Sequence, residues 1–461
     1  MTIRHLRNLT LALLPLLACG GGAPTGGPPP APAPALQITP ATARICVGGA
    51  VTFQVRESTG TPIAAAFTVQ DGSAQIGDDG RFQAPAHPGL FRVLGRSLTA
   101  PARSVEATVQ VEPYAGKLTE APALNVPRMG HTASLLDTGE VLVVGGWTST
   151  LTERYDERTG TFVLGPRLDG LRMDATATPL PGGRALIAGG EGADGMPRTA
   201  LLYEGGAFRA LAQAMETPRR RHTVTALLDG RVLLAGGLPV RGSEVRATDR
   251  AELFDPATET FQALDPMTAS RTGHTATRLL DGRVLIVGGL DSTCQASCPQ
   301  RCWSSAEIFD PRTRTFASTG SMAIARAGHA ATLLPDGRVL VAGGFSPDLQ
   351  GTDLATSVEI YDPATGRFTF AGRLLRPRAE HQATLLGDGT VLLSGGRTEG
   401  EGTLASATCE AFDPDTGQSR LAISDRITRY RHRAVRLESG AVLLIGGSEG
   451  GGSLSAVERY Q

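Results

Sequence analysis

The sequence lacks an excess of charge of either sign, a long apolar run after its first residues, and a recognisable catalytic set. Lys and Arg number 44, Asp and Glu number 45, and the net charge is −1, which argues against a function based on nucleic-acid electrostatics. Beyond the N-terminus no apolar stretch is long enough to span a bilayer. No carboxylate pair, Ser-His-Asp set or phosphate loop stands out. We therefore expect no catalytic residue, no metal and no cofactor.

Glycine and proline are abundant instead, with 58 and 30 residues, and much of the glycine belongs to a repeat. Seven arginines are each followed 17 residues later by a Gly-Gly pair. The arginines are Arg128, Arg172, Arg219, Arg271, Arg326, Arg378 and Arg429. The pairs are Gly145-Gly146, Gly189-Gly190, Gly236-Gly237, Gly288-Gly289, Gly343-Gly344, Gly395-Gly396 and Gly446-Gly447. A fixed period of about 45–55 residues predicts an array of units that bury their apolar faces against one another.

Each unit predicts four antiparallel strands. In residues 326–378, the first strand is Ala330 to Leu334, and Asp336-Gly337 makes a hairpin turn. The second strand, 339–342, is apolar throughout, which predicts burial on both faces between neighbouring sheets. A third strand at 358–361 follows a variable loop, and Phe368 starts a fourth. Four antiparallel strands in each period are typical of a propeller blade.

The two ends of the array predict how it closes. The phenylalanine of the fourth strand lies 10 residues before the next arginine in four units, and Leu118 occupies that place before Arg128. The chain stops at 458–461, in a third strand with nothing after it. We therefore expect the strand around Leu118 to complete the last blade, which gives seven blades closed from the N-terminal side and removes the exposed sheet edges.

The repeat resembles a known family. The Gly-Gly after an apolar strand, the Arg-x-x-His before it and the later Glu-x-aromatic-Asp-Pro resemble kelch repeats, in the bacterial variant also found in galactose-oxidase-like propellers. The match covers about 114–461. The resemblance implies an all-β fold, a seven-bladed kelch-type β-propeller.

The first residues resemble the export signal of a bacterial lipoprotein. Arg4 and Arg7 precede the apolar run 9–17, and Leu16 to Cys19 resembles a lipobox. The resemblance implies cleavage after residue 18 and lipid attachment at Cys19, with an ordinary secretory signal as the alternative. Residues 19–35 are rich in Gly, Pro and Ala and predict a semi-extended tether. We expect an exported protein held to the cell envelope by lipid alone, in the outer membrane.

Residues 36–113 predict a small β-sandwich before the array. Strand-like runs at 50–55, 67–70, 90–94 and 105–111 are separated by turn signals. The motifs around Gln37-Ile38-Thr39-Pro40, 48–53 and 80–85 resemble bacterial Ig-like domains. The resemblance implies a spacer without catalytic residues.

Length varies almost only between the Gly-Gly pair and the third strand of each unit. In a four-stranded blade these loops share one face of the disc with the connections between blades. A constant framework with variable loops on one face is how scaffolds present binding surfaces. The alternative is drift of loop length where nothing constrains it.

Polar residues of the repeat are interpreted as structural. Six histidines stand three residues after a repeat arginine: His131, His222, His274, His329, His381 and His432. They could suggest a metal site, but each belongs to a different blade, where we expect it to pack against the next blade. The second unit has Ala175 in place of histidine and Leu201 in place of glutamate. This joint loss hints at a His–Glu or shared polar network.

Three of the six cysteines lie close together, at 294, 298 and 302. In an exported protein a local disulfide is the default, and we expect Cys294 to pair with Cys302. A three-thiolate metal site is the alternative, although the spacing does not match the Cys-x2-Cys of zinc sites.

Three classes of function remain. The first is a monomeric, non-catalytic envelope lipoprotein whose loop face binds a protein or a glycan. The second is a copper radical oxidase similar to galactose oxidase, but that family's Tyr-His dipeptide is missing here. The third is a sugar mutarotase-like kelch enzyme with its active site on the loop face. We favour the first.

Overall fold

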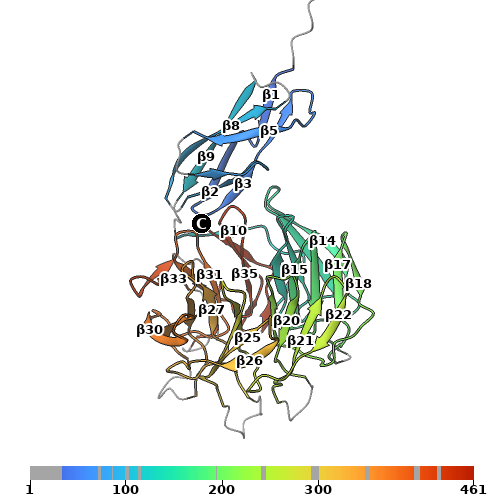
Figure 1. The fold of residues 1–461 in the computed structure, drawn as a ribbon, viewed down its shortest axis with the longest axis vertical. Coiled ribbons are helices and arrows are strands. Elements are labelled where there is room, and N and C mark those ends of the chain that lie inside the picture. The colour runs from blue at the N-terminus through green and yellow to red at the C-terminus, as the bar shows by residue number, and fades with distance from the viewer. Residues whose placement is uncertain are drawn as a thin grey trace, which may run out of the picture.

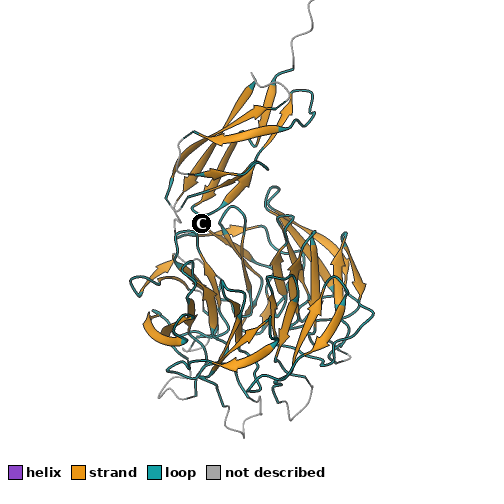
Figure 2. Ribbon diagram, in the orientation of Figure 1, coloured by secondary structure: helices purple, strands orange, loops and turns teal. Residues whose placement is uncertain are grey.

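The computed structural model describes residues 34–461 except 71–73, 86, 99–102, 113–115, 194, 240–245, 292–300, 348–353, 399–404, 407 and 423–426. Ordered secondary structure in this part of the chain is β throughout (Figure 2). None of these residues forms a helix that could cross a membrane. Cys19, most of the predicted tether and Cys294 lie outside the described residues.

An N-terminal unit, residues 34–112, contains nine strands in three sheets. The strands are β1 Leu36–Thr39, β2 Thr42–Cys46, β3 Ala50–Thr52, β4 Gln54–Glu57, β5 Ala65–Val69, β6 Gln75–Ile76, β7 Arg81–Gln83, β8 Gly89–Ser97 and β9 Ser104–Glu112. The sheet orders are β1-β4, β2-β9-β8-β5 and β3-β7-β6. The single strand predicted at 50–55 is wrong, because β3 pairs with β7 and β4 with β1. The chain changes sheets at Phe53, which is fully buried.

From residue 118 onward the described chain forms seven four-stranded sheets, here called sheets 1 to 7 in order of their arginines (Figure 1). Their first strands are β11 Thr132–Leu135, β15 Thr176–Leu180, β19 Thr223–Ala226, β23 Thr275–Arg278, β27 Ala330–Leu333, β31 Gln382–Leu385 and β35 Arg433–Arg436. The second are β12 Glu140–Val144, β16 Arg184–Ala188, β20 Val232–Ala235, β24 Val284–Val287, β28 Val339–Ala342, β32 Val391–Ser394 and β36 Val442–Ile445. The third are β13 Leu151–Asp156, β17 Leu201–Glu204, β21 Ala251–Asp255, β25 Ala306–Asp310, β29 Ser357–Asp362, β33 Cys409–Asp413 and β39 Val457–Tyr460. The fourth are β14 Thr161–Arg167, β18 Ala207–Ala210, β22 Thr260–Ala263, β26 Thr315–Ser318, β30 Arg367–Arg373, β34 Gln418–Ala422 and β10 Leu118–Ala121. A short hairpin, β37 Ser448–Glu449 with β38 Gly452–Ser453, lies in the last loop.

Sheet 7 combines both ends of the array. β10 pairs antiparallel with β39, with Leu118 opposite Tyr460 and Ala121 opposite Val457. β11 of sheet 1 contacts β35 of sheet 7, and the first strands of all other neighbouring sheets also contact one another. The sheets therefore stand around a common axis, as in a β-propeller.

The second strands form the core between the sheets. All four residues of β28 are buried, as the apolar run predicts, and β20, β24, β32 and β36 share the same pattern. In sheets 1 to 5 an aromatic pair joins the third and fourth strands, such as Phe254 with Phe261, whose ring centroids lie 4.9 Å apart. Apolar burial of this kind contributes roughly 25 cal/mol per Å².

One backbone hydrogen bond recurs at every junction between sheets. The N–H of the second glycine of each Gly-Gly pair donates to the carbonyl of the repeat arginine in the next sheet. The N···O distances are 3.1 Å for Gly146 to Arg172, 2.9 Å for Gly190 to Arg219, 2.8 Å for Gly237 to Arg271, 2.9 Å for Gly289 to Arg326, 2.8 Å for Gly344 to Arg378, 2.8 Å for Gly396 to Arg429, and 2.9 Å for Gly447 to Arg128. The last bond joins sheet 7 to sheet 1.

The N-terminal unit packs directly on sheets 6 and 7, at the turns between their first and second strands (Figure 1). The N–H of Cys46 donates to the carbonyl of Ser439 at 2.9 Å, and the N–H of Ala50 donates to the carbonyl of Glu438. Arg436 donates to the carbonyl of Gly48 at 2.8 Å. Cys46 belongs to the same buried cluster as Leu386, Leu444 and Tyr460.

Glycines make this close approach possible. A Cβ added to Gly387 would overlap the carbonyl oxygen of Val47, and one added to Gly49 would overlap the carbonyl of Ser439. A Cβ on Gly48 would lie 2.7 Å from the Cα of Gly387. At the position of Gly387, other sheets carry larger residues such as Leu228 and Leu280. Gly387 is thus the residue that admits the N-terminal unit.

We predict that Gly387→Ala separates the N-terminal unit from sheets 6 and 7, because overpacking a close contact costs about 1–3 kcal/mol. Calorimetry should show a lower-temperature transition, and proteolysis between the two parts should become faster. The control is Gly170→Ala, where nothing lies within 4 Å of the added methyl group. Equal behaviour of the two variants would contradict the packing role of Gly387.

Candidate functional site

The strand order gives the ring of sheets two distinct faces. Turns from first to second and from third to fourth strands lie at one face, here called the turn face, because neighbouring strands are antiparallel. Loops from second to third strands, and the connections between sheets, lie at the opposite loop face. The N-terminal unit contacts turn-face residues 436–440 and Gly387. The variable loops therefore lie on the face that it does not contact.

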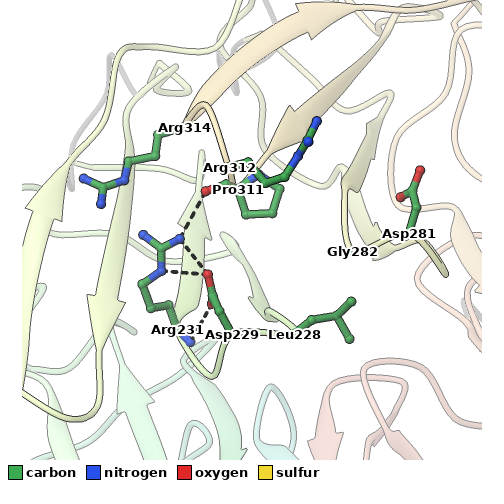
Figure 3. A pocket seen from close by; sticks show the side chains of 8 residues that line it. All are labelled: Leu228, Asp229, Arg231, Asp281, Gly282, Pro311, Arg312 and Arg314. Carbon is green, nitrogen blue, oxygen red and sulfur yellow. Dashed lines mark hydrogen bonds and ion pairs between the residues drawn. The ribbon is translucent and has the colours of Figure 1, made fainter.

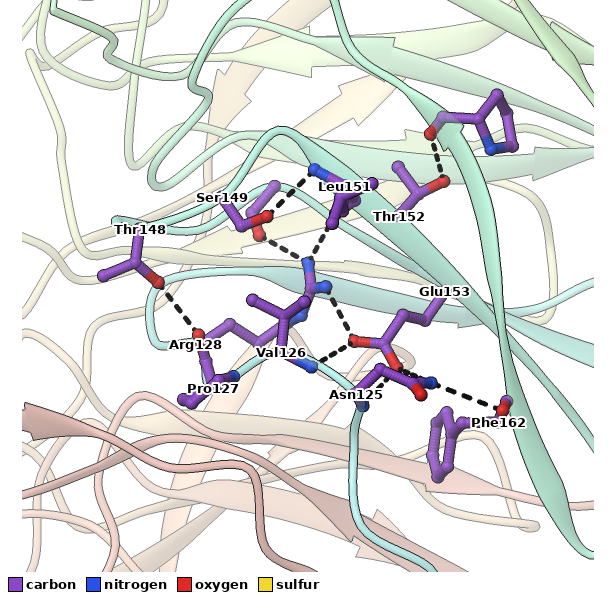
Figure 4. A network of polar contacts seen from close by, with 12 residues as sticks. Asn125, Val126, Pro127, Arg128, Thr148, Ser149, Leu151, Thr152, Glu153 and Phe162 are labelled. Atoms are coloured by element: carbon purple, nitrogen blue, oxygen red, sulfur yellow. Dashed lines mark hydrogen bonds and ion pairs between the residues drawn. The ribbon is translucent and has the colours of Figure 1, made fainter.

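The repeat arginines are anchored within their own sheets. Arg128 is fully buried and donates to the carbonyls of Gly145 and Leu151, both at 3.0 Å, and to the carboxylate of Glu153 at 2.8 Å (Figure 4). Glu153 also accepts the backbone N–H groups of Asn125 and Val126. The same bond from arginine to the first glycine of the pair occurs in all seven sheets. Protein groups hold the Nη atoms of these arginines, whereas the Nε of Arg128, Arg172, Arg378 and Arg429 is buried without a hydrogen-bond partner among the described residues. Burial lowers the pKa of Arg128 against the opposing effect of Glu153.

Sheet 2 shows how the repeat accommodates the missing glutamate. Leu201 stands where other sheets have glutamate, and Arg172 turns instead to Asp169 at 3.3 Å. The hint of a His–Glu network is wrong, because the glutamates pair with arginines, such as Glu252 with Arg219 at 2.6 Å. Loss of the histidine in this sheet has no account in the structure.

The six repeat histidines are buried and pack against the preceding sheet, so the prediction that they pack against the next one is wrong. The Cε1 atom of His274 lies 2.7 Å from a Cβ built on Gly236, so only glycine leaves room for the ring. Thr223 and the Nε2 of His274 lie 2.9 Å apart, and the pairs Thr176–His222 and Thr275–His329 repeat this contact. Desolvation lowers the pKa of His274 and His329 to about 3. The imidazoles are neutral packing groups.

One open pocket lies on the turn face between sheets 3 and 4 (Figure 3). Its volume is about 340 Å³, and Leu228, Arg231 and Gly282 are among its lining residues. Arg231 is bound to Asp229 at 2.6 Å and to the carbonyl of Pro311 at 3.1 Å. Asp281 and Arg312 also have partners outside the pocket lining, Arg283 at 2.7 Å and Asp310 at 3.2 Å. The charged groups of the pocket are thus engaged by neighbouring residues.

The centre of the loop face carries charges that the sequence analysis missed. The residue two places after each repeat arginine has a positive φ, and in sheets 1, 4 and 5 it is glycine. In the other sheets it is charged, with φ between 52° and 55°. We call these four residues, Asp174, Arg221, Glu380 and Arg431, the central cluster. A left-handed conformation costs a non-glycine residue about 1–2 kcal/mol, and such strain often accompanies functional sites.

Ion pairs connect the central cluster. Arg221 lies 3.0 Å from Asp174 of the adjacent sheet, and Arg431 lies 3.4 Å from Glu380. Arg221 also lies 4.0 Å from Glu380, although their sheets, 3 and 6, are not adjacent. The attraction of Asp174 and Glu380 keeps the pKa of Arg221 raised, although its side chain is partly buried and desolvation opposes the charge. The signal available in the sequence was the replacement of glycine by charged residues at one fixed place.

Three cysteines, Cys46, Cys302 and Cys409, lie among the described residues, and all three are buried. Cys302 is buried, and its sulfur lies 3.7 Å from the carbonyl of Phe345, but its predicted partner Cys294 lies outside the described residues. Burial raises the pKa of the Cys46 and Cys409 thiols to about 11. No group of three or more potential metal ligands occurs among the residues that the structure describes.

Comparisons with known proteins identify the type of repeat. The chain is 25% identical over 245 residues to Kelch-like protein terF of Aspergillus terreus, a match that covers 51% of each protein. It is 28% identical over 347 residues to Kelch-like protein 34 of Homo sapiens, covering 72% of this chain and 52% of that protein. The chain carries a kelch-type β-propeller. It spans about half the length of these relatives, and no family model matches it.

Solved structures agree on the kelch-type fold. YjhT matches with a TM-score of 0.51 at 14% identity, over 65% of this chain and 99% of YjhT. A fungal alcohol oxidase of the AA5 family, in complex with copper, matches with a TM-score of 0.58 at 17% identity, over 75% of each chain. Identities this low show the fold alone.

We predict that Glu359→Ala lowers the free energy of unfolding by about 3–5 kcal/mol, because it leaves the buried Arg326 guanidinium without its 2.7 Å partner. Asp169→Ala in sheet 2 should cost much less, since the Asp169 side chain is 56% exposed. Urea denaturation measures both. Equal losses of unfolding free energy in the two variants would show that burial of the carboxylate does not determine how much the ion pair stabilises the protein.

Stability should fall as the pH drops from about 6.5 toward 4. The pKa values of the buried histidines are depressed in the folded state, those of His274 and His329 to about 3 from an ordinary 6.5, so the unfolded chain binds the extra protons. Their contribution is complete above pH 6.5. Lowered aspartate pKa values, such as that of Asp310, act only below about 3.8. Melting temperatures across this range should therefore show a shallower pH dependence in His274→Gln, and an unchanged slope would contradict the assignment.

Proposed function

We propose that this chain is an exported lipoprotein, anchored through Cys19 in the outer membrane, whose kelch propeller binds a protein or glycan partner without catalysis. Sheets 1 to 7 are the seven blades of the propeller, with β10 completing the last. The N-terminal unit is an Ig-like sandwich at residues 36–113, behind a signal peptide at 1–18 and a tether at 19–35. The propeller occupies 114–461.

One observation carries the proposal. The N-terminal unit, through which any lipid anchor would act, packs on the turn face at Gly387 and residues 436–440. The loop face lies on the other side of the blades, so an anchored protein would hold its variable loops away from the membrane. Kelch-like relatives agree with a binding role, although the chain covers only about half of their length.

Trp147 is the residue of the loop face that best fits a contact with a partner. It follows the Gly-Gly pair of blade 1, its N–H is held by the carbonyl of Met129 at 3.1 Å, and 54% of its surface is exposed. A large aromatic side chain on a fixed backbone is typical of the residues that dominate binding energy.

We predict that Trp147→Ala weakens partner binding by about 2 kcal/mol, roughly thirtyfold. The full-length protein in detergent would be used to capture partners from a cell-envelope extract and from a glycan array. Phe370→Ala is the matched control, because Phe370 is 63% exposed on the outer strand β30. Capture that survives the first substitution, or is lost equally in both, would overturn the assignment of the loop face.

A further inference from the structure

The centre of the loop face holds more arginine than the neighbouring carboxylates neutralise. Four places in each repeat define this centre: the two residues after the repeat arginine, the residue after the Gly-Gly pair, and the first residue of the first strand. Charged residues at these places are Asp174, Glu191 and Glu380 on one side and Arg220, Arg221, Arg397, Arg431 and Arg433 on the other. Five arginines thus face three carboxylates in a protein whose net charge is −1.

Each of the three carboxylates already has an arginine. Glu191 lies 3.2 Å from Arg220, while Asp174 and Glu380 are paired within the central cluster. The ion pairs of this region within the described part of the chain involve Arg220, Arg221 and Arg431, and neither Arg397 nor Arg433 takes part in one. Within the residues that the structure describes, these two positive charges therefore have no carboxylate partner.

Arg433 is the more informative of the two. It opens β35 two residues after Arg431, at the place where the other blades have Thr132, Thr176, Thr223, Thr275, Ala330 and Gln382. Arg433 is only partly exposed, and desolvation lowers its pKa against a weaker opposing effect of Asp174. A charged guanidinium that is partly removed from water and has no carboxylate beside it raises the free energy of the folded protein. A bound anion would offset that cost. Arginine suits carboxylate and sulfate groups because its donors form a planar fork.

We propose that the centre of the loop face binds an acidic glycan, whose carboxylate or sulfate group is held by Arg433. This rests on the proposed function and names its ligand class. A sugar is favoured over an acidic peptide by the exposed Trp147, whose blade adjoins that of Arg433. The link between the two blades is the N–H of Gly130, which donates to the carbonyl of Arg431 at 3.4 Å. An indole face packs well against a sugar ring while the arginine receives the charge.

The repeat itself supplies the variant that tests this. Arg433→Thr installs the residue found in four other blades, three of which place the threonine against the next histidine at 2.9–3.1 Å. The variant should therefore keep or raise the melting temperature. Its binding to polygalacturonate, measured by calorimetry on the full-length protein, should weaken about tenfold or more. Arg312→Gln on the turn face, where the side chain is 86% exposed, is the control and should bind normally.

Two pairs of polysaccharides distinguish a carboxylate ligand from a sulfate ligand. Polygalacturonate is compared with fully methyl-esterified pectin, and dextran sulfate with dextran, so that only the charged group differs. Binding of one charged member that depends on Arg433 supports the proposal and tells carboxylate from sulfate. Binding of neither, while partner capture through Trp147 persists, overturns the acidic-glycan site and leaves the proposed function standing. Arg433-dependent binding of polyglutamate alone would overturn the glycan assignment, and a drop in the melting temperature of Arg433→Thr would make Arg433 structural.

Discussion

The hydrogen bond from the second glycine of one repeat to the arginine carbonyl of the next holds the ring of sheets together. It occurs at all seven junctions at 2.8–3.1 Å, and it fixes what may stand around it. The first glycine must lack a side chain, because a Cβ on Gly288 would lie 2.5 Å from the carbonyl of Arg326 and 2.8 Å from the ring of His329. The arginine side chain then folds back to the carbonyl of its own first glycine, 17 residues on. A change in the number of residues between the arginine and the Gly-Gly pair would separate the guanidinium from the glycine carbonyl that it binds. This dependence is a physical reason for the constant interval of 17 residues.

Much of the propeller could be predicted because its signals are local and repeated. Strand order, the burial of second strands and the pairing of Leu118 with the last strand all follow from spacing along the chain. The orientation of the histidines could not be obtained that way, because a period does not tell which neighbour a side chain meets. The division of 50–57 between β3 and β4 was missed since Phe53, the residue at the change of sheets, is as apolar as a strand residue.

The central cluster was missed for a different reason. Arg221 and Glu380 are separated by three repeats and come within 4.0 Å only because the sheets surround one axis. Docking of the N-terminal unit was equally hidden. Gly387 is one of many glycines in turns, but its φ is not in the left-handed region. It must be glycine because the carbonyl of Val47 occupies the place of a Cβ. A single sequence cannot distinguish a glycine that allows another unit to pack closely from a glycine that allows a positive φ.

The two faces of the ring depart from the repeat in opposite ways. On the turn face, where the N-terminal unit contacts sheets 6 and 7, the repeat position is occupied by a smaller residue, Gly387, which allows backbone to approach backbone. On the loop face the departures are toward charge in left-handed positions, where glycine would cost less. A residue that disfavours its local backbone conformation can be kept when contacts with the surrounding structure or with a ligand offset the cost in free energy. The pairs Asp174–Arg221 and Glu380–Arg431 compensate one another, whereas Arg433 receives no such partner in the described structure. That imbalance, rather than the presence of charge, is what directs attention to an anionic ligand.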